Sequence, residues 1–219
     1  MGFELFLSAF VSLFVVVDPF GTAAVFAVLT SAMTQKQKFY IALKAMIIAI
    51  SILLIFSYVG KALLDYMHIS LPAFRVAGGA LLFVTAFRMI MGYHDPDQLE
   101  SETTIYKDRS DIAVFPLAIP MHAGPGVMTA VIMFSTAAQD FVSHLQVAAA
   151  IVLVQILALF SLLGAGVLSR FFGATGNSII ARVMGILLAA MAVQFIADGI
   201  TELFRLRDFP GMIPEIMQG

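Results

Sequence analysis

The sequence of 219 residues contains no cysteine and no tryptophan, and only 12% of its residues are charged. The absence of cysteine excludes disulfides, thiolate catalysis and cysteine-based metal sites. Charged residues make up about 25% of a typical soluble domain, so the low charge excludes an ordinary soluble domain. The net charge of −2 provides no overall basic field, and we therefore expect no nucleic-acid partner.

Apolar residues account for 61% of the chain, and the mean hydropathy is +0.99. Several apolar runs reach the length of about 20 residues that an α-helix needs to cross a bilayer. The sequence therefore predicts an all-α, polytopic protein embedded in a lipid bilayer. Six transmembrane helices are expected, at about residues 3–33, 39–64, 71–92, 112–138, 144–168 and 178–204.

A long polar stretch at residues 93–111 divides the chain into two parts of three spans each. Residues 1–92 form the first part and residues 112–204 the second, with a short C-terminal tail at residues 205–219. The polar stretch has no apolar period, so we predict that it is a solvated loop.

The two parts resemble each other in sequence. The stretch GTAAV that begins at Gly21 returns as GVMTA at Gly126, and AFRVAG from Ala73 returns as IARVMG from Ile180. Matching glycine and arginine positions are harder to obtain by chance than matching apolar ones, so we predict an internal duplication. Three spans is an odd number, and the second copy therefore enters the membrane from the opposite side. This predicts two inverted three-helix repeats, as in many secondary transporters.

Lysine and arginine favour the cytoplasmic side of a membrane, and their distribution predicts the orientation. With the N-terminus outside, eight of these residues fall inside and four outside. We therefore predict that both termini are periplasmic and that the loop at residues 93–111 is cytoplasmic. The inside set is Lys36, Lys38, Lys44, Arg88, Lys107, Arg109, Arg170 and Arg182, and the outside set is Lys61, Arg75, Arg205 and Arg207.

Two of the predicted spans contain residues that interrupt helices. The first span contains Asp18-Pro19-Phe20-Gly21-Thr22, and the fourth contains His122-Ala123-Gly124-Pro125-Gly126, followed by Thr129. Proline removes a backbone donor, and a carboxylate inside an apolar span is costly. The breaks fall at equivalent places in the two parts. We therefore predict that spans one and four are discontinuous and that all of these residues line a substrate-binding site.

Broken helices at the membrane midplane leave backbone groups that hydrocarbon cannot satisfy. The half-helices beginning at Thr22 and Val127 would offer N–H groups to a carboxylate, and the preceding half-helices would offer carbonyls to an ammonium group. A small zwitterion fits both ends of such a site. The alternative is an ordinary helix start, with Asp18 as N-cap and Pro19 at the first helical position. The two roles are compatible.

These motifs carry a family resemblance that covers essentially the whole chain. The chain resembles the MarC family of bacterial inner-membrane proteins, which includes small neutral amino acid transporters of the SnatA type. Family members show Asp-Pro-x-Gly in the first span, matched at residues 18–21, and Ala-Gly-Pro-Gly in the fourth, matched at residues 123–126. Thr22 and Ala24 stand where the family usually has Asn and a second Pro, so the substrate need not be that of the characterised transporters.

The resemblance implies a multi-pass protein of the bacterial inner (plasma) membrane. It further implies secondary active transport of small neutral amino acids of the glycine and alanine class, coupled to protons or, alternatively, to sodium. Alternating access would take place about a midplane site formed by the two broken helices. No cofactor and no metal are expected, and a homo-oligomer is left open.

Three ionisable residues in the spans are candidates for proton coupling. Asp18 lies in the first break, and His122 lies in the second, where the imidazole would titrate near neutral pH. The preferred interpretation of His122 is a ring hydrogen-bonded to an unwound carbonyl. Asp198 lies in the last span one turn after Gln194 and is either functional or paired with an arginine near the interface. Gln155 is expected to form an interhelical hydrogen bond.

Other classes of function compete with transport. The sequence contains no zinc-protease, nucleophile-elbow or phosphate-loop motif, so we expect no enzyme. Paired half-helices also build channels, but a channel needs a continuous polar pathway, and the spans contain few polar residues outside the breaks. A non-transporting membrane scaffold or assembly factor is the remaining alternative.

Overall fold

The structure is a computed structural model and describes residues 2–92 and 112–206. The described chain is helical. Its elements are α1 (Gly2–Val17), α2 (Pro19–Leu29), α3 (Gln35–Tyr66), α4 (Leu71–Met91), η1 (Ala113–His122), α6 (Pro125–Ala137), α7 (Phe141–Leu163) and α8 (Ala165–Leu206). The predicted loop at residues 93–111 lies outside the described residues, as does the tail from residue 207.

Five helical segments are long and apolar enough to cross a membrane. A sixth span results when η1 and α6, which are bent by 52° at a short break, are counted together. The protein is therefore an all-helical polytopic membrane protein, as predicted, with five to six candidate spans.

Polar capping residues mark where several helices begin. Thr34 and Gln37 form a capping box at the start of α3, in which each side chain bonds the backbone N–H of the other. The Ser70 side chain accepts a hydrogen bond from the first turn of α4, and Asp140 does the same for α7. These side chains satisfy N–H groups that have no partner within their own helix.

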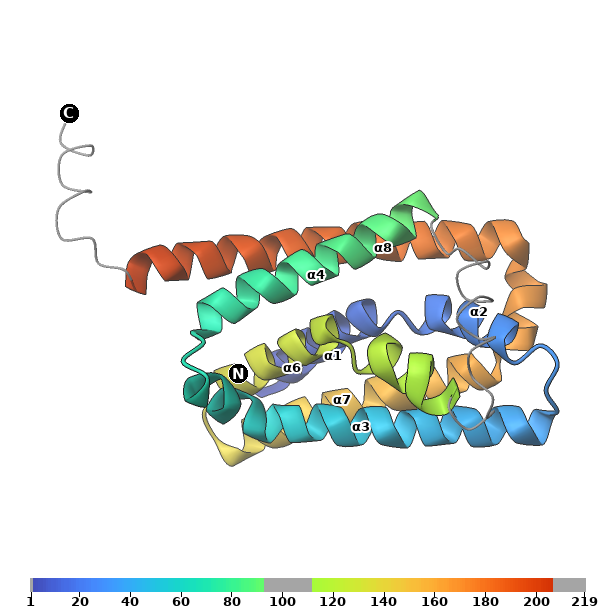
Figure 1. Cartoon of the computed structure of the whole chain (residues 1–219), viewed down its shortest axis with the longest axis horizontal. Helices are drawn as coiled ribbons and strands as arrows, with labels where there is room; N and C mark the ends of the chain where they lie inside the picture. Colours follow the sequence, from blue (N-terminus) through green and yellow to red (C-terminus); the bar gives the residue numbers. More distant parts are fainter. Residues whose placement is uncertain (1, 93–111, 207–219) are drawn as a thin grey trace.

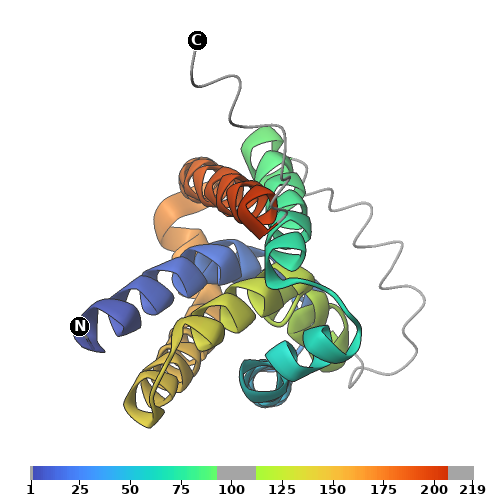
Figure 2. The same cartoon turned by 90° about the vertical axis from the view of Figure 1, so that its left-hand side faces the viewer.

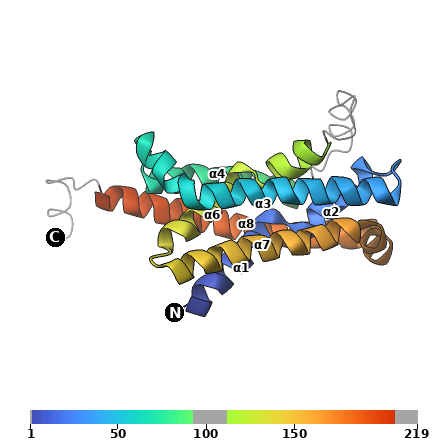
Figure 3. The same cartoon turned by 90° about the horizontal axis from the view of Figure 1, so that it is seen from below.

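The helices are arranged in three layers. Helices α4 and α8 form one outer layer and α3 and α7 the other, with α1, α2, η1 and α6 between them (Figure 1). The view along the molecule shows the same order (Figure 2). The partners within each outer layer run in opposite directions, as Figure 3 shows for α3 and α7. The interrupted segments therefore lie in the middle layer, where α2 packs on α7 and α8, α6 packs on α3 and α4, and η1 packs on α3.

Glycines allow α4 and α8 to pack closely. A Cβ atom on Gly79 would lie 2.8 Å from the backbone oxygen of Ala192, and one on Gly199 would lie 2.8 Å from that of Pro72. A Cβ on Gly185 would lie 3.0 Å from Met89. Small residues at such positions let helix backbones approach, which is how helices associate in membranes. This contact fixes α4 against α8 and thereby against the middle layer.

A buried hydrogen bond joins the middle layer to α3. The hydroxyl groups of Ser57 on α3 and Ser135 on α6 lie 2.6 Å apart. Both side chains are buried, and each satisfies the hydrogen-bonding group of the other. The bond ties the half-helix after the second break to a continuous helix.

The segment between the last two predicted spans is also helical. The last candidate span covers Ser178–Phe204, as predicted, but α8 already begins at Ala165 and continues through residues 169–177. Figure 1 shows the first turns of α8 rising from the end of α7 before the helix turns back along α4. The segment contains no proline, and glycine in a helix costs only about 1 kcal/mol relative to alanine. Its glycines and polar residues were therefore no barrier to helix formation.

The close contact between α4 and α8 predicts the effect of one added methyl group. Gly199→Ala should lower the thermal unfolding midpoint of the purified protein in detergent, because the new Cβ would contact the backbone of Pro72. Overpacking of this kind costs about 1–3 kcal/mol. Gly166→Ala is the matched control, since it lies in the same helix with nothing within 4 Å of the added Cβ. Equal midpoints for the two variants would contradict this account of the packing.

Candidate functional site

Asp18 forms the first break between α1 and α2. Its backbone is left-handed, with φ 46° and ψ 71°, a conformation that aspartate tolerates better than most residues. The carboxylate accepts a hydrogen bond of 3.2 Å from the N–H of Gly21, and the side chain is only 7% exposed. Asp18 is therefore the N-cap of α2, as the simpler interpretation of the sequence proposed.

The backbone on both sides of Asp18 remains hydrogen-bonded. Its N–H donates to the carbonyl of Phe14 at 3.1 Å, and its carbonyl accepts from the N–H and the hydroxyl of Thr22, both at 3.0 Å. The rings of Phe14 and Phe20 pack edge to face across the break with centroids 6.1 Å apart. The first span is thus interrupted at a single residue. The expectation of a free N–H at Thr22 is wrong, because Asp18 satisfies it.

The second break extends over a whole segment. Within η1, Phe115 and Ile119 have extended backbones, each directly before a proline. Proline disfavours the helical conformation of the residue before it, so the sequence accounts for both irregularities. A link at Ala123 and Gly124 follows, and α6 begins at Pro125.

The start of α6 differs from that of α2 because it has no side-chain cap. Gly124 occupies the N-cap position, and glycine has no side chain that could accept a hydrogen bond from the helix. The N–H groups of the first helical turn have no partner within the helix, and Gly126 and Val127 of that turn line a cavity. Of the two helix starts that were predicted to offer backbone N–H groups to a ligand, only the start of α6 can therefore do so.

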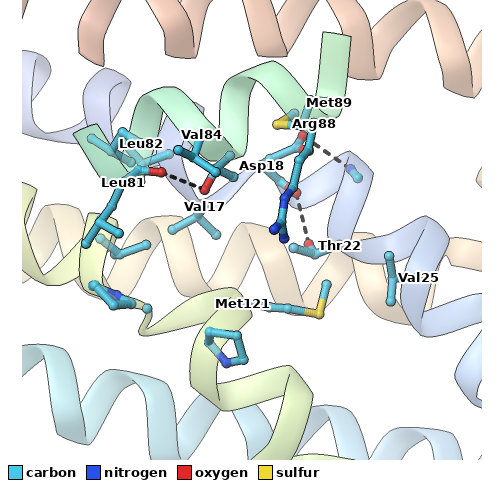
Figure 4. A pocket seen from close by; sticks show the side chains of 18 residues that line it. Val17, Asp18, Thr22, Val25, Leu81, Leu82, Val84, Arg88, Met89 and Met121 are labelled. Carbon is cyan, nitrogen blue, oxygen red and sulfur yellow. Dashed lines mark hydrogen bonds between the residues drawn. The ribbon is translucent and has the colours of Figure 1, made fainter. Parts of the chain in front are cut away.

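The two breaks meet at one cavity of about 440 Å³. Small-molecule sites typically have volumes of about 300–1,000 Å³. The first break contributes Asp18, Gly21 and Thr22 to its wall, and the second contributes residues on both sides of the link, from Pro120 to Val127. Figure 4 shows these segments facing each other, with α4 as the third wall.

Six of the predicted site residues line this cavity: Asp18, Gly21, Thr22, Gly124, Pro125 and Gly126. The other five, Pro19, Phe20, His122, Ala123 and Thr129, do not line it. Phe20 packs on Phe14 instead. Thr129 is buried against Gly78, and its hydroxyl donates to the carbonyl of Pro125 at 2.8 Å. These residues shape the breaks from behind rather than facing the cavity.

His122 is fully buried, and its ring has no hydrogen-bond partner among the described residues. The expectation of a ring bonded to an unwound carbonyl is therefore wrong. The carbonyl of His122 instead accepts from the amide of Gln155 on α7, at 3.2 Å. This confirms the predicted interhelical role of Gln155.

Asp198 lies away from the cavity. Its carboxylate accepts a hydrogen bond of 2.7 Å from Gln194, and both side chains are exposed on α8. Arg75 on α4 pairs with Glu202 at 3.0 Å and not with Asp198. In residues 2–92 and 112–206, no three His, Asp or Glu side chains gather closely enough to hold a metal ion.

Sequence reasoning missed the contribution of α4. This helix lines the cavity with one face, which carries Leu81, Leu82, Val84, Thr85, Arg88 and Met89. The spacing of Leu81, Thr85 and Arg88 along one helix face was visible in the sequence. What that face opposes depends on the packing of α4 against α8 and α6, which the sequence pattern does not specify.

The comparison with known families agrees with this architecture. A family model described as "MarC family integral membrane protein" matches residues 3–204. The chain belongs to the MarC family. The MarC match covers both breaks and every described helix except the ends of α1 and α8.

Several members of the MarC family from distant organisms are similar along nearly their whole length. A UPF0056 membrane protein of Archaeoglobus fulgidus is 35% identical over 197 residues, which cover 90% of this chain and 92% of the relative. The UPF0056 membrane protein YhcE of Escherichia coli is 34% identical over 218 residues, which cover 96% of each. The names of these relatives state no substrate. No solved structure matches the chain.

The cap geometry predicts how Asp18 contributes to stability. Asp18→Ala removes the acceptor for Gly21 and places alanine in a left-handed conformation, so we expect a loss of about 0.5–2 kcal/mol or more. Asp18→Asn keeps a side-chain oxygen and tolerates this backbone, so it should unfold at nearly the wild-type temperature. Thermal unfolding in detergent tests both. An Asn variant as unstable as the Ala variant would show that the charge itself holds the break.

Proposed function

We propose that the protein is a secondary active transporter of small neutral amino acids, of the glycine and alanine class, driven by protons. The observation that carries the proposal is the convergence of two helix breaks, about a hundred residues apart in sequence, on one cavity within the membrane-spanning layer. Irregular backbone at membrane depth occurs where it is buried or lines a wet cavity, and discontinuous helices of this kind form the substrate sites of many transporters.

The pairing of the helices supports an inverted repeat. Exchanging α1 with η1, α2 with α6, α3 with α7 and α4 with α8 leaves most of the packing pattern unchanged. Helix α2 packs on α7 and α8, and α6 packs on the corresponding α3 and α4. The exchanged partners also run in opposite directions (Figures 1 and 3). Alternating access by one repeat moving against the other follows naturally from such an arrangement.

The chemistry of the cavity favours a small neutral substrate. Most of its wall is apolar, formed by valine, leucine and methionine side chains from α1, α2, α4 and η1. A charged side chain on the substrate, in addition to its ammonium and carboxylate groups, would find no partner against such a surface. A short aliphatic side chain, by contrast, gains from burial there.

Asp18 is the group that we assign to proton coupling. Among the described residues that line the cavity it is the sole carboxylate. One of its oxygens is held by Gly21, which leaves the carboxylate able to meet an ammonium group or to take up a proton. Asp140 makes the same cap at the start of α7 in an exposed position, where hydrogen bonds from Ser143 lower its pKa. An exposed aspartate can thus cap a helix, so capping alone does not explain why Asp18 is buried beside the cavity.

Uptake into proteoliposomes tests the proposal. The purified protein should take up radiolabelled glycine or alanine saturably, faster with an inward proton gradient and slowly once a protonophore removes it. Asp18→Asn should abolish the response to the gradient, because amide protonation does not occur in this pH range. Asp140→Asn is the matched control, with the same change in an exposed cap. Absence of saturable uptake by folded wild-type protein would contradict the transporter, and an unaltered gradient response in Asp18→Asn would contradict its role.

Bulk at the second break should block transport without unfolding the protein. A Cβ on Gly126 would contact the Leu82 side chain across the cavity wall, so Gly126→Leu should reduce the uptake rate by about tenfold or more. Gly21→Leu should act similarly, because its Cβ would contact the Asp18 carboxylate. Gly166→Leu, with open space around the glycine, should transport normally. Normal uptake by both Gly21→Leu and Gly126→Leu would contradict the site assignment.

A further inference from the structure

We propose that Arg88 is a substrate-binding residue that recognises the carboxylate of the transported amino acid. This inference rests on the proposed transport function and specifies which side chain would hold the acidic end of a zwitterion. Arg88 lies in the last turn of α4 and lines the same cavity as Asp18. Figure 4 shows its side chain extending from α4 into the cavity, toward the first turn of α2.

Arg88 is the cationic side chain of the cavity among the described residues, as Asp18 is the anionic one. The two do not form an ion pair, although they line the same space. Because neither charge is neutralised by the other, each can bind the complementary end of a ligand. An ammonium group would face Asp18 and a carboxylate would face Arg88.

The start of α2 strengthens this assignment by excluding a competing one. The sequence predicted that N–H groups of α2 would bind the substrate carboxylate, but Asp18 and its carbonyl occupy those at Gly21 and Thr22. Placing the substrate carboxylate there would bring it against the carboxylate of Asp18. A guanidinium group presents several donors in a plane that matches a carboxylate, which a single backbone N–H does not.

The simpler role for Arg88 is that of a charge at the end of a helix. A cation in the last turn interacts favourably with the helix dipole, and its stem can extend along the apolar surface to water. Arg182 on α8 is also an exposed arginine, lies close to Gly92 at the end of α4 and does not line the cavity. The pair therefore offers a comparison between an arginine inside the cavity wall and one outside it.

The test measures recognition of a carboxylate and not only the rate of transport. Uptake of labelled alanine into proteoliposomes is inhibited with glycine or with glycinamide, which keeps the ammonium group and lacks the carboxylate. In wild-type protein, glycine should inhibit at a concentration about tenfold or more below that of glycinamide. In Arg88→Gln, the concentration of glycine needed should rise by about 10-fold to 100-fold, and that of glycinamide should change little.

Two further variants distinguish binding from structure. Arg88→Lys keeps the charge without the planar donors, so it should restore part of the preference for glycine. Arg182→Gln, the same change outside the cavity, should keep the wild-type ratio. An unchanged ratio of glycine to glycinamide in Arg88→Gln, with uptake still present, would overturn this inference and leave the transporter intact. Failure of the wild-type protein to transport would overturn both.

Discussion

Hydrocarbon cannot hydrogen-bond to a peptide group, and the structure depends on how the chain meets this constraint where its helices break. At the first break Asp18 bonds both neighbouring turns: its N–H donates to the carbonyl of Phe14, and its carboxylate and carbonyl accept from Gly21 and Thr22. At the second, the chain passes through η1 and an uncapped helix start. Neighbouring helices cover the first break, whereas Phe115 and Ile119 of the second remain partly exposed on the outside of η1.

The packing of α4 links this constraint to recognition. Glycines at the contact between α4 and α8 fix how α4 lies, and the opposite face of α4 then becomes the third wall of the cavity. That wall supplies the positively charged side chain of Arg88, whereas the breaks supply only the negative charge of Asp18. The site is consequently a product of the packing as much as of the motifs, and residues far from the conspicuous proline and glycine stretches help to define what it binds.

The positions of the breaks follow from local chemistry and could be predicted from the sequence. The other parts of the site depend on tertiary packing and could not. Proline acts on its own residue and the one before it, so the sequence located the interruption at Asp18 and the irregular segment before Pro125. Which space a side chain on a helix faces depends on the neighbouring helices. The sequence therefore counted Arg88 only among the cytoplasmic basic residues, although it lines the cavity, and placed His122 in the cavity wall, which it does not line. Residues 169–177 fell between two predicted spans because they are less apolar, yet nothing in that segment forbids a helix, and α8 includes it.

The two breaks are unequal in mechanical terms. Across Asp18 the ladder of backbone hydrogen bonds continues from Phe14 to Thr22, so α1 and α2 form a stiff rod with a fixed bend. The segment from Ala113 to Gly124 contains two extended residues and meets α6 at 52°. A movement of one proposed repeat against the other would therefore meet a bend at a single hydrogen-bonded residue in the first break and a longer irregular segment in the second.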